Sequence, residues 1–128
     1  MRRSMLGAAA AGALYGAAAF AEPALEIRLV DLEPGREGGS ATVGVQLSDV
    51  EMVDPASANE RVEKGEGHLH YRLDDGPVIA TTATRLGFHE LRPGEHRIEV
   101  TLVGNNHRPL GPREVLAVTV PASPSASR

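Results

Sequence analysis

Apolar and polar residues alternate in short runs along most of this chain, and turn-forming residues separate the runs. Segments 25–29, 69–73 and 98–102 each place an apolar side chain at every second position. Successive side chains of a β-strand point to opposite faces, so a period of two predicts strands with one buried face. No amphipathic helix is evident beside them. The chain is therefore expected to be all-β.

Seven segments carry this pattern within about 100 residues, which is the strand count of an immunoglobulin-like (Ig-like) antiparallel β-sandwich. They are 25–29, 41–47, 69–73, 78–82, 86–88, 98–102 and 115–120. The stretch from Phe88 to Val100 supports this fold, because its Leu-x-Pro-Gly turn leads into an alternating strand, as at one corner of such domains. We therefore predict one Ig-like domain over residues 22–120. It lacks the disulfide and core tryptophan of the fold, so it would be a bacterial variant.

Residues 1–21 have the composition of a cleaved signal peptide. Arg2 and Arg3 precede an apolar, Ala/Gly-rich stretch at 6–19, and small residues at its end offer a cleavage site. The mature protein is expected to start at Glu22 and to be periplasmic or secreted. The apolar stretch is too short for a membrane span, so no span is expected after cleavage. The arginine pair also fits a twin-arginine signal, which leaves the export route open.

The composition excludes several classes of function. There is no cysteine, which rules out a disulfide framework, a thiolate metal site and a cysteine nucleophile. The net charge of −4 becomes −6 once the two signal arginines are removed, so nucleic acid and anionic lipid are poor partners. No serine lies in a strand–turn–helix elbow. Residues 121–128, rich in Ser, Pro and Ala, are expected to form a disordered tail.

Three of the five histidines are predicted to meet at one end of the domain. His68 and His70 lie two residues apart on one strand and share its outer face with Arg72, their Cα atoms about 6.5–7 Å apart. In an Ig-like sandwich the start of the third strand lies beside the end of the sixth, and the loop after the sixth carries His107. Three imidazoles suit zinc or copper(II). We therefore predict His68, His70 and His107 as metal ligands.

The other two histidines have simpler interpretations. His96 has the parity of the inward-facing residues of its strand and takes the place of a corner tyrosine, so it is expected to bond to the turn backbone. His89 is expected to be a solvated surface residue. Asn105 and Asn106 are interpreted as turn residues that tolerate left-handed backbone. The His-x-His pair could itself be two exposed polar residues, and the spacing alone leaves that interpretation open.

The stretch from Gly65 to Pro121 resembles a group of small, exported, largely uncharacterised bacterial proteins. The shared pattern stands here as Gly67-His68-Leu69-His70 with Asp74, then Pro93-Gly94-Glu95-His96, then Asn105-Asn106-His107-Arg108-Pro109. The resemblance covers a little under half of the precursor. It implies an all-β envelope protein and supports grouping the three predicted ligands, but it implies no established activity. His96 belongs to the pattern as well.

Three classes of function follow from these residues. The first is a periplasmic protein that holds copper or zinc for buffering or delivery, without catalysis. The second is an Ig-like envelope module that binds a protein or glycan without metal, since the sandwich hosts many binding roles. The third is a small metalloenzyme with an acid such as Glu66 as base, although no other residue is well placed as acid or base. A non-enzymatic metal-binding protein is the expectation that we carry forward.

Overall fold

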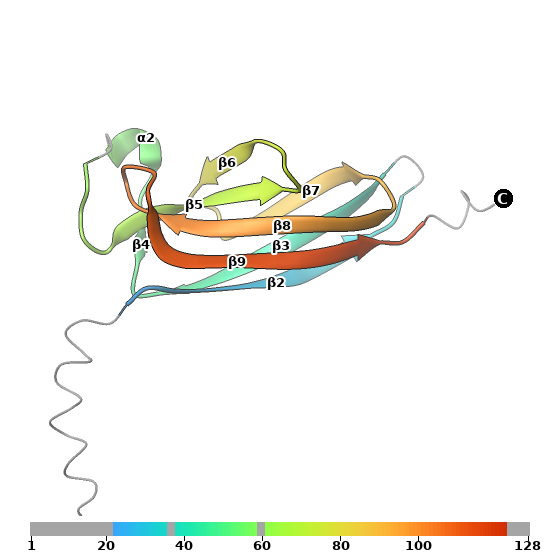
Figure 1. Cartoon of the computed structure of the whole chain (residues 1–128), viewed down its shortest axis with the longest axis horizontal. Coiled ribbons are helices and arrows are strands. Elements are labelled where there is room, and N and C mark those ends of the chain that lie inside the picture. Colours follow the sequence, from blue (N-terminus) through green and yellow to red (C-terminus); the bar gives the residue numbers. More distant parts are fainter. Residues whose placement is uncertain (1–21, 36–37, 59–60, 123–128) are drawn as a thin grey trace, which may run out of the picture.

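The computed structural model describes residues 22–35, 38–58 and 61–122, and within these ranges the protein is all-β (Figure 1). The only helix among them is α2, a single turn at Pro55–Ala58. The predicted signal peptide and most of the predicted tail lie outside the described residues, so both remain predictions. No helix in the described part of the chain is long and apolar enough to cross a membrane.

The first sheet contains three antiparallel strands in the order β2-β3-β7. These are β2 (Ala24–Glu33), β3 (Gly39–Ser48) and β7 (Arg85–Leu91). The register pairs the apolar residues of neighbouring strands, as in Ile27 opposite Val45. That pairing places the alternating apolar side chains of the sheet on one common face.

The second sheet contains five strands and carries the candidate site. Its antiparallel part runs β6-β5-β8-β9, formed by β5 (Glu66–Leu73), β6 (Val78–Thr81), β8 (Gly94–Val103) and β9 (Pro109–Val120). The two-residue strand β4 (Glu51–Met52) pairs in parallel with the start of β5. The second sheet is therefore mixed, and β4 brings the connection before β5 alongside the start of β5.

Most strands extend beyond the predicted segments, and the differences that matter for the site are an added strand and an earlier start of β9. Strand β4 lies between the predicted segments 41–47 and 69–73, where no strand was predicted, and it raises the described strands to eight. Strand β9 begins at Pro109 and not at residue 115, because the loop before it is short. The amide of Gly104 donates to the carbonyl of Arg108, and that of His107 donates to Gly104. This tight loop lets β9 pair with β8 at once, and Pro109 is tolerated because β9 is an edge strand.

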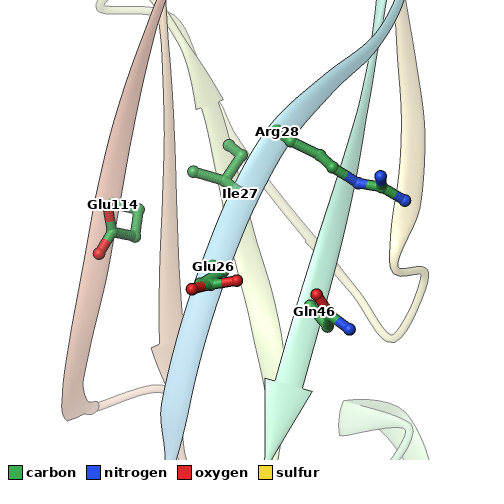
Figure 2. A pocket seen from close by; sticks show the side chains of 5 residues that line it. All are labelled: Glu26, Ile27, Arg28, Gln46 and Glu114. Carbon is green, nitrogen blue, oxygen red and sulfur yellow. The ribbon is translucent and has the colours of Figure 1, made fainter.

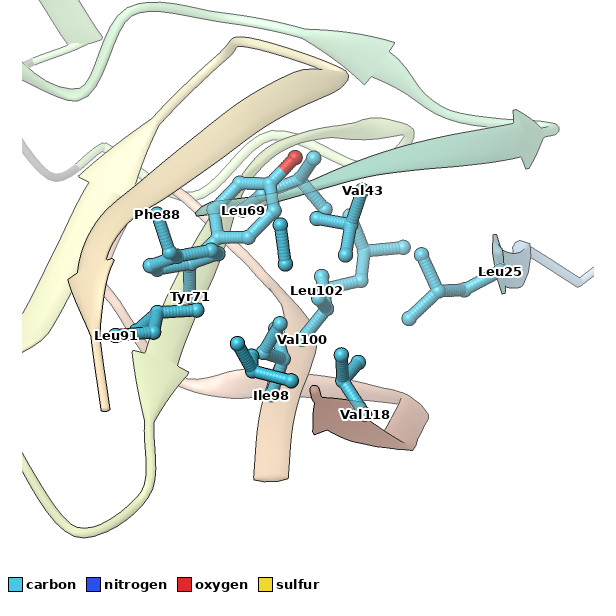
Figure 3. Close-up of a cluster of buried hydrophobic side chains, with 12 residues drawn as sticks. Leu25, Val43, Leu69, Tyr71, Phe88, Leu91, Ile98, Val100, Leu102 and Val118 are labelled. Atoms are coloured by element: carbon cyan, nitrogen blue, oxygen red, sulfur yellow. The ribbon is translucent and has the colours of Figure 1, made fainter. Parts of the chain in front are cut away.

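The core lies between the two sheets and draws apolar side chains from both (Figure 3). Leu25, Val43 and Phe88 come from the first sheet, whereas Tyr71 and Val100 come from the second. Each such burial stabilises the fold by about 1.5–3 kcal/mol. The predicted inward parity is confirmed for 69–73 and 98–102, whereas Leu29 in the segment 25–29 is 39% exposed beside a register shift in β2. The odd-numbered face of β5 is committed to the core. The even-numbered face of β5, which carries the histidine pair, therefore points out of the sandwich.

Candidate metal centre

The register of the second sheet places the His-x-His pair at the end of the sheet where β8 finishes. His68 lies opposite Val103, and His70 lies opposite Thr101 on β8. The chain then turns between β8 and β9 and brings His107 back over the same end. His107 follows His70 by 37 residues in the sequence, so strand pairing brings the three predicted ligands together.

The ring nitrogens of the three histidines lie within 4.8 Å of one another, close enough to hold one metal ion. Nε2 of His70 lies 3.2 Å from Nε2 of His68 and 3.2 Å from Nδ1 of His107. Two nitrogens at that separation, each about 2.05 Å from one ion, subtend about 103° at it. This is close to the tetrahedral angle of about 109° that zinc prefers. Small side-chain adjustments would therefore give three metal–nitrogen bonds.

Protons alone do not satisfy this cluster. A ring nitrogen of a neutral imidazole carries either one proton or one lone pair. Nε2 of His70 faces a second nitrogen on each side, at 3.2 Å in both cases. It can form one full hydrogen bond and leaves the other contact without a shared proton. A cation between the rings would instead accept a lone pair from each of the three nitrogens.

Burial keeps these rings neutral. Burial, with smaller contributions from His70 and then His107, lowers the pKa of His68 to about 4, and the carboxylate of Asp54 offsets this only in part. Burial, followed by the influence of His107, also lowers the pKa of His70. At neutral pH both side chains are therefore unprotonated, which is the state that binds metal.

His68 is less exposed than the sequence analysis expected. Its side chain shares the outer side of the sheet with His70 but is fully buried. The connection before β5 lies close to this side chain, since the amide of Val53 donates to the carbonyl of Gly67 and the charge of Asp54 reaches the His68 ring. The alternation of β5 could not reveal this burial, because the nearby segment lies outside the antiparallel strands.

Asn105 lies in the turn between β8 and β9, as predicted, and its side chain has a further role. It is 1% exposed, and its side-chain amide donates to the carbonyl of Arg61 at 2.8 Å and to Oε1 of Glu66 at 3.0 Å. These bonds tie the loop that carries His107 to the start of β5 and the segment before it. The left-handed backbone expected at Asn105 or Asn106 occurs instead at His107, whose φ is 66°.

Gly67 allows the close strand contact beside His68. A Cβ atom at this position would overlap the backbone carbonyl of Val103 on β8. Any other residue at position 67 would therefore push β5 away from β8 at the point where His68 begins the pair. The Gly-His-x-His pattern contains this glycine, but only the register of β5 against β8 explains why a glycine is needed there.

One nitrogen near the centre still lacks a partner. Nδ1 of His68 is buried with no hydrogen-bond partner in the described structure. A metal on Nε2 would place the ring proton on Nδ1, where metal-bound histidines usually donate to a carboxylate or carbonyl. Asp54, whose Oδ1 accepts the amide of Ala56, is the carboxylate whose charge reaches this ring.

The remaining histidines lie elsewhere, as the sequence analysis expected. His96 is at the opposite end of β8, where it pairs with Val118. Its Nε2 donates to the carbonyl of Arg92 at 2.8 Å, and its Nδ1 donates to Oδ2 of Asp74 at 2.9 Å. The bond to Arg92 and then that to Asp74 raise the pKa of His96. His89 is exposed on β7.

A separate hollow lies where β2 approaches β9 (Figure 2). It is lined by Glu26, Ile27, Arg28, Gln46 and Glu114. None of these residues is a histidine, and the charged side chains of Glu26, Arg28 and Glu114 are exposed, so they do not form a reactive group. The histidine cluster is therefore the chemical centre of the described structure.

Neither a protein-family model nor a curated protein matches the sequence.

Proposed function

We propose that this chain is an exported protein of the periplasm or extracellular space that holds one copper or zinc ion through His68, His70 and His107, without catalysis. The observation that carries the proposal is the convergence of two ring nitrogens, one from His68 and one from His107, on Nε2 of His70, each at 3.2 Å. The two lowered pKa values supply lone pairs at neutral pH. Imidazole suits both metals, and geometry alone does not choose between them.

An Ig-like domain is the scaffold that we infer for this site. In chain order, leaving out β4, strands one, two and five form one sheet, and strands four, three, six and seven form the other. Constant-type Ig domains likewise separate their first, second and fifth strands from their third, sixth and seventh. The fourth strand, β6, joins the second sheet here and not the first. The bacterial envelope group of the sequence pattern is consistent with this arrangement.

The position of Glu66, the acid considered as a catalytic base, favours metal binding without hydrolysis. Glu66 accepts a hydrogen bond from the side-chain amide of Asn105 and so holds the loop between β8 and β9. A general base must reach the water or substrate that it activates. The histidines therefore have a structural carboxylate nearby, and the role that fits them is buffering or delivery of the ion.

Titration of the chain, made without a histidine tag, with copper(II) and zinc would test the proposal. We expect one ion per chain, and the His70→Ala variant should lose this binding. The matched control is His89→Ala, because His89 is an exposed histidine on another strand. Equal binding by His70→Ala and the unmodified chain would contradict the proposal. Absence of tight binding in all three proteins would favour the metal-independent envelope module.

A further inference from the structure

The outer face of the second sheet carries a shallow groove that runs up to the histidine cluster. Its lining includes His70, Arg72, Glu99, Thr101 and His107. Two of the three proposed ligands are part of its wall. The third, His68, is fully buried and lies behind them. A metal ion held by the cluster would therefore meet solvent through this groove.

The donor set leaves room for one more ligand on the ion. Among the described residues, the group that could hold an ion consists of three histidines and includes no carboxylate. Zinc and cobalt(II) sites with three protein nitrogens take a fourth ligand from solution, usually water. The protein closes the His68 side of the ion, because the His68 side chain is fully buried. The fourth position therefore faces the groove.

The groove also favours a negative ligand. Arg72 lies two residues from His70 on the same face of β5, about 6.5–7 Å away. Its guanidinium is held by the carbonyls of Gly76 and Asp75, at 3.0 and 3.4 Å, and these bonds use two of its five N–H donors. The nearby carboxylate of Glu99 is paired with Arg113, which offsets its repulsion of an anion. The cation on the histidines would add the largest positive charge.

We propose that the metal-loaded protein binds a small monodentate anion at this fourth position, by way of the groove. The inference rests on the proposed function, because the anion's partner is the ion held by the three histidines. It goes beyond storage of the ion, since an exchangeable position is what a metal-delivery protein needs for hand-over to an incoming ligand.

Azide binding to the cobalt(II)-loaded full chain tests this proposal. Cobalt(II) stands in for zinc, and its visible absorption reports changes in its ligands. We expect azide to shift the absorption bands in a saturable titration. A Thr101→Phe variant, with a bulky ring opposite His70, should weaken azide binding by at least about tenfold while cobalt affinity changes by less than about threefold.

Two control variants make the result specific to the groove. Thr119→Phe puts the same ring on β9 of the same sheet, at the far end where Thr119 pairs with Glu95, and should bind azide normally. Thr101→Val keeps the size of the side chain and should also bind azide normally. Failure of cobalt to bind to the unmodified chain would overturn the proposed function itself. Cobalt binding without any azide response, or an equal azide affinity in Thr101→Phe, would overturn only this inference.

Discussion

The histidines near the two ends of β8 lie in opposite chemical settings. At one end, Nε2 of His70 faces two other ring nitrogens. At the other end, both ring nitrogens of His96 face oxygen acceptors, one on Arg92 and one on Asp74. Two acceptors call for two donors, so His96 is satisfied as the protonated imidazolium. Three converging nitrogens call instead for a shared cation.

The difference teaches that the partners of a histidine decide its role. Oxygen acceptors raise the pKa of His96, whereas burial lowers the pKa of His68 and His70. The first setting holds a proton and links the turn after β5 to the corner before β8. The second rejects protons and keeps lone pairs available. One residue type thus serves as a structural link at one end and as a set of metal donors at the other.

Metal affinity should separate the two ends most strongly. His68→Leu removes one of three donors and should weaken copper(II) or zinc binding by about 100-fold or more, since even outer-shell changes cost 10–100-fold. His96→Gln should leave affinity within about twofold, because His96 lies at the far end of the strand. Competition titration against a chelator of known affinity measures both. Comparable losses in the two variants would break the assignment of roles.

Acid should destabilise the metal-free protein through the cluster. The folded pKa of His68 is below its ordinary value, so its contribution is complete above about pH 6.5 and is lost as the pH falls toward 4. Between pH 7.5 and pH 5 this amounts to about 1–2 kcal/mol of unfolding free energy. Urea unfolding at the two pH values should show the loss in the unmodified chain and a smaller one in His68→Leu. An identical pH dependence in both would remove His68 as the cause.

The His96 corner should respond with the opposite sign. Its folded pKa is raised, so its stabilisation is complete below about pH 6.5 and is lost as the pH rises through the folded value. His96→Gln should therefore lower the unfolding free energy by about 1 kcal/mol at pH 6 and by less at pH 9. Asp74 is about half exposed, which keeps the ion pair weak. A larger cost at pH 9 than at pH 6 would contradict the charged pair.

The smallest effect is expected at the exposed histidine on β7. His89→Ala should change the unfolding free energy by less than about 0.5 kcal/mol at any pH between 5 and 8, as surface substitutions usually do. It should also leave metal affinity unchanged. Urea unfolding and the same chelator competition measure both quantities. A clear response of either quantity would show that His89 takes part in the fold or in the metal site.

Strand parity and turn placement carried most of the sequence prediction. Alternation around Leu69 and Tyr71 placed His68 and His70 on the outer face, and strand order then brought His107 beside them. Both inferences depend on the alternation of apolar and polar residues and on the pairing of antiparallel strands, and both features can be recognised in the sequence. The inward side chain of His96 and its bond to the turn backbone followed from the same parity.

The details that complete the site were not predictable in this way. His68 is fully buried although it lies on the outer face, and the polar segment that pairs beside it through β4 shows no alternation in the sequence. The role of Asn105 depends on contacts with Arg61 and Glu66, 44 and 39 residues away. Such contacts are set by how loops meet in space. The sequence alone does not distinguish an asparagine that bonds to a distant segment from one that only forms a turn.

The glycine before the histidine pair has a consequence for how such sites can be inherited. Gly67 offers no donor atom, yet a side chain there would separate β5 from β8 beside His68. Selection for the geometry of the cluster would therefore act on position 67 as strictly as on the histidines. A search for relatives that use the same site should require the glycine with the pair, because His-x-His on a strand held further from its neighbour would not meet the returning loop.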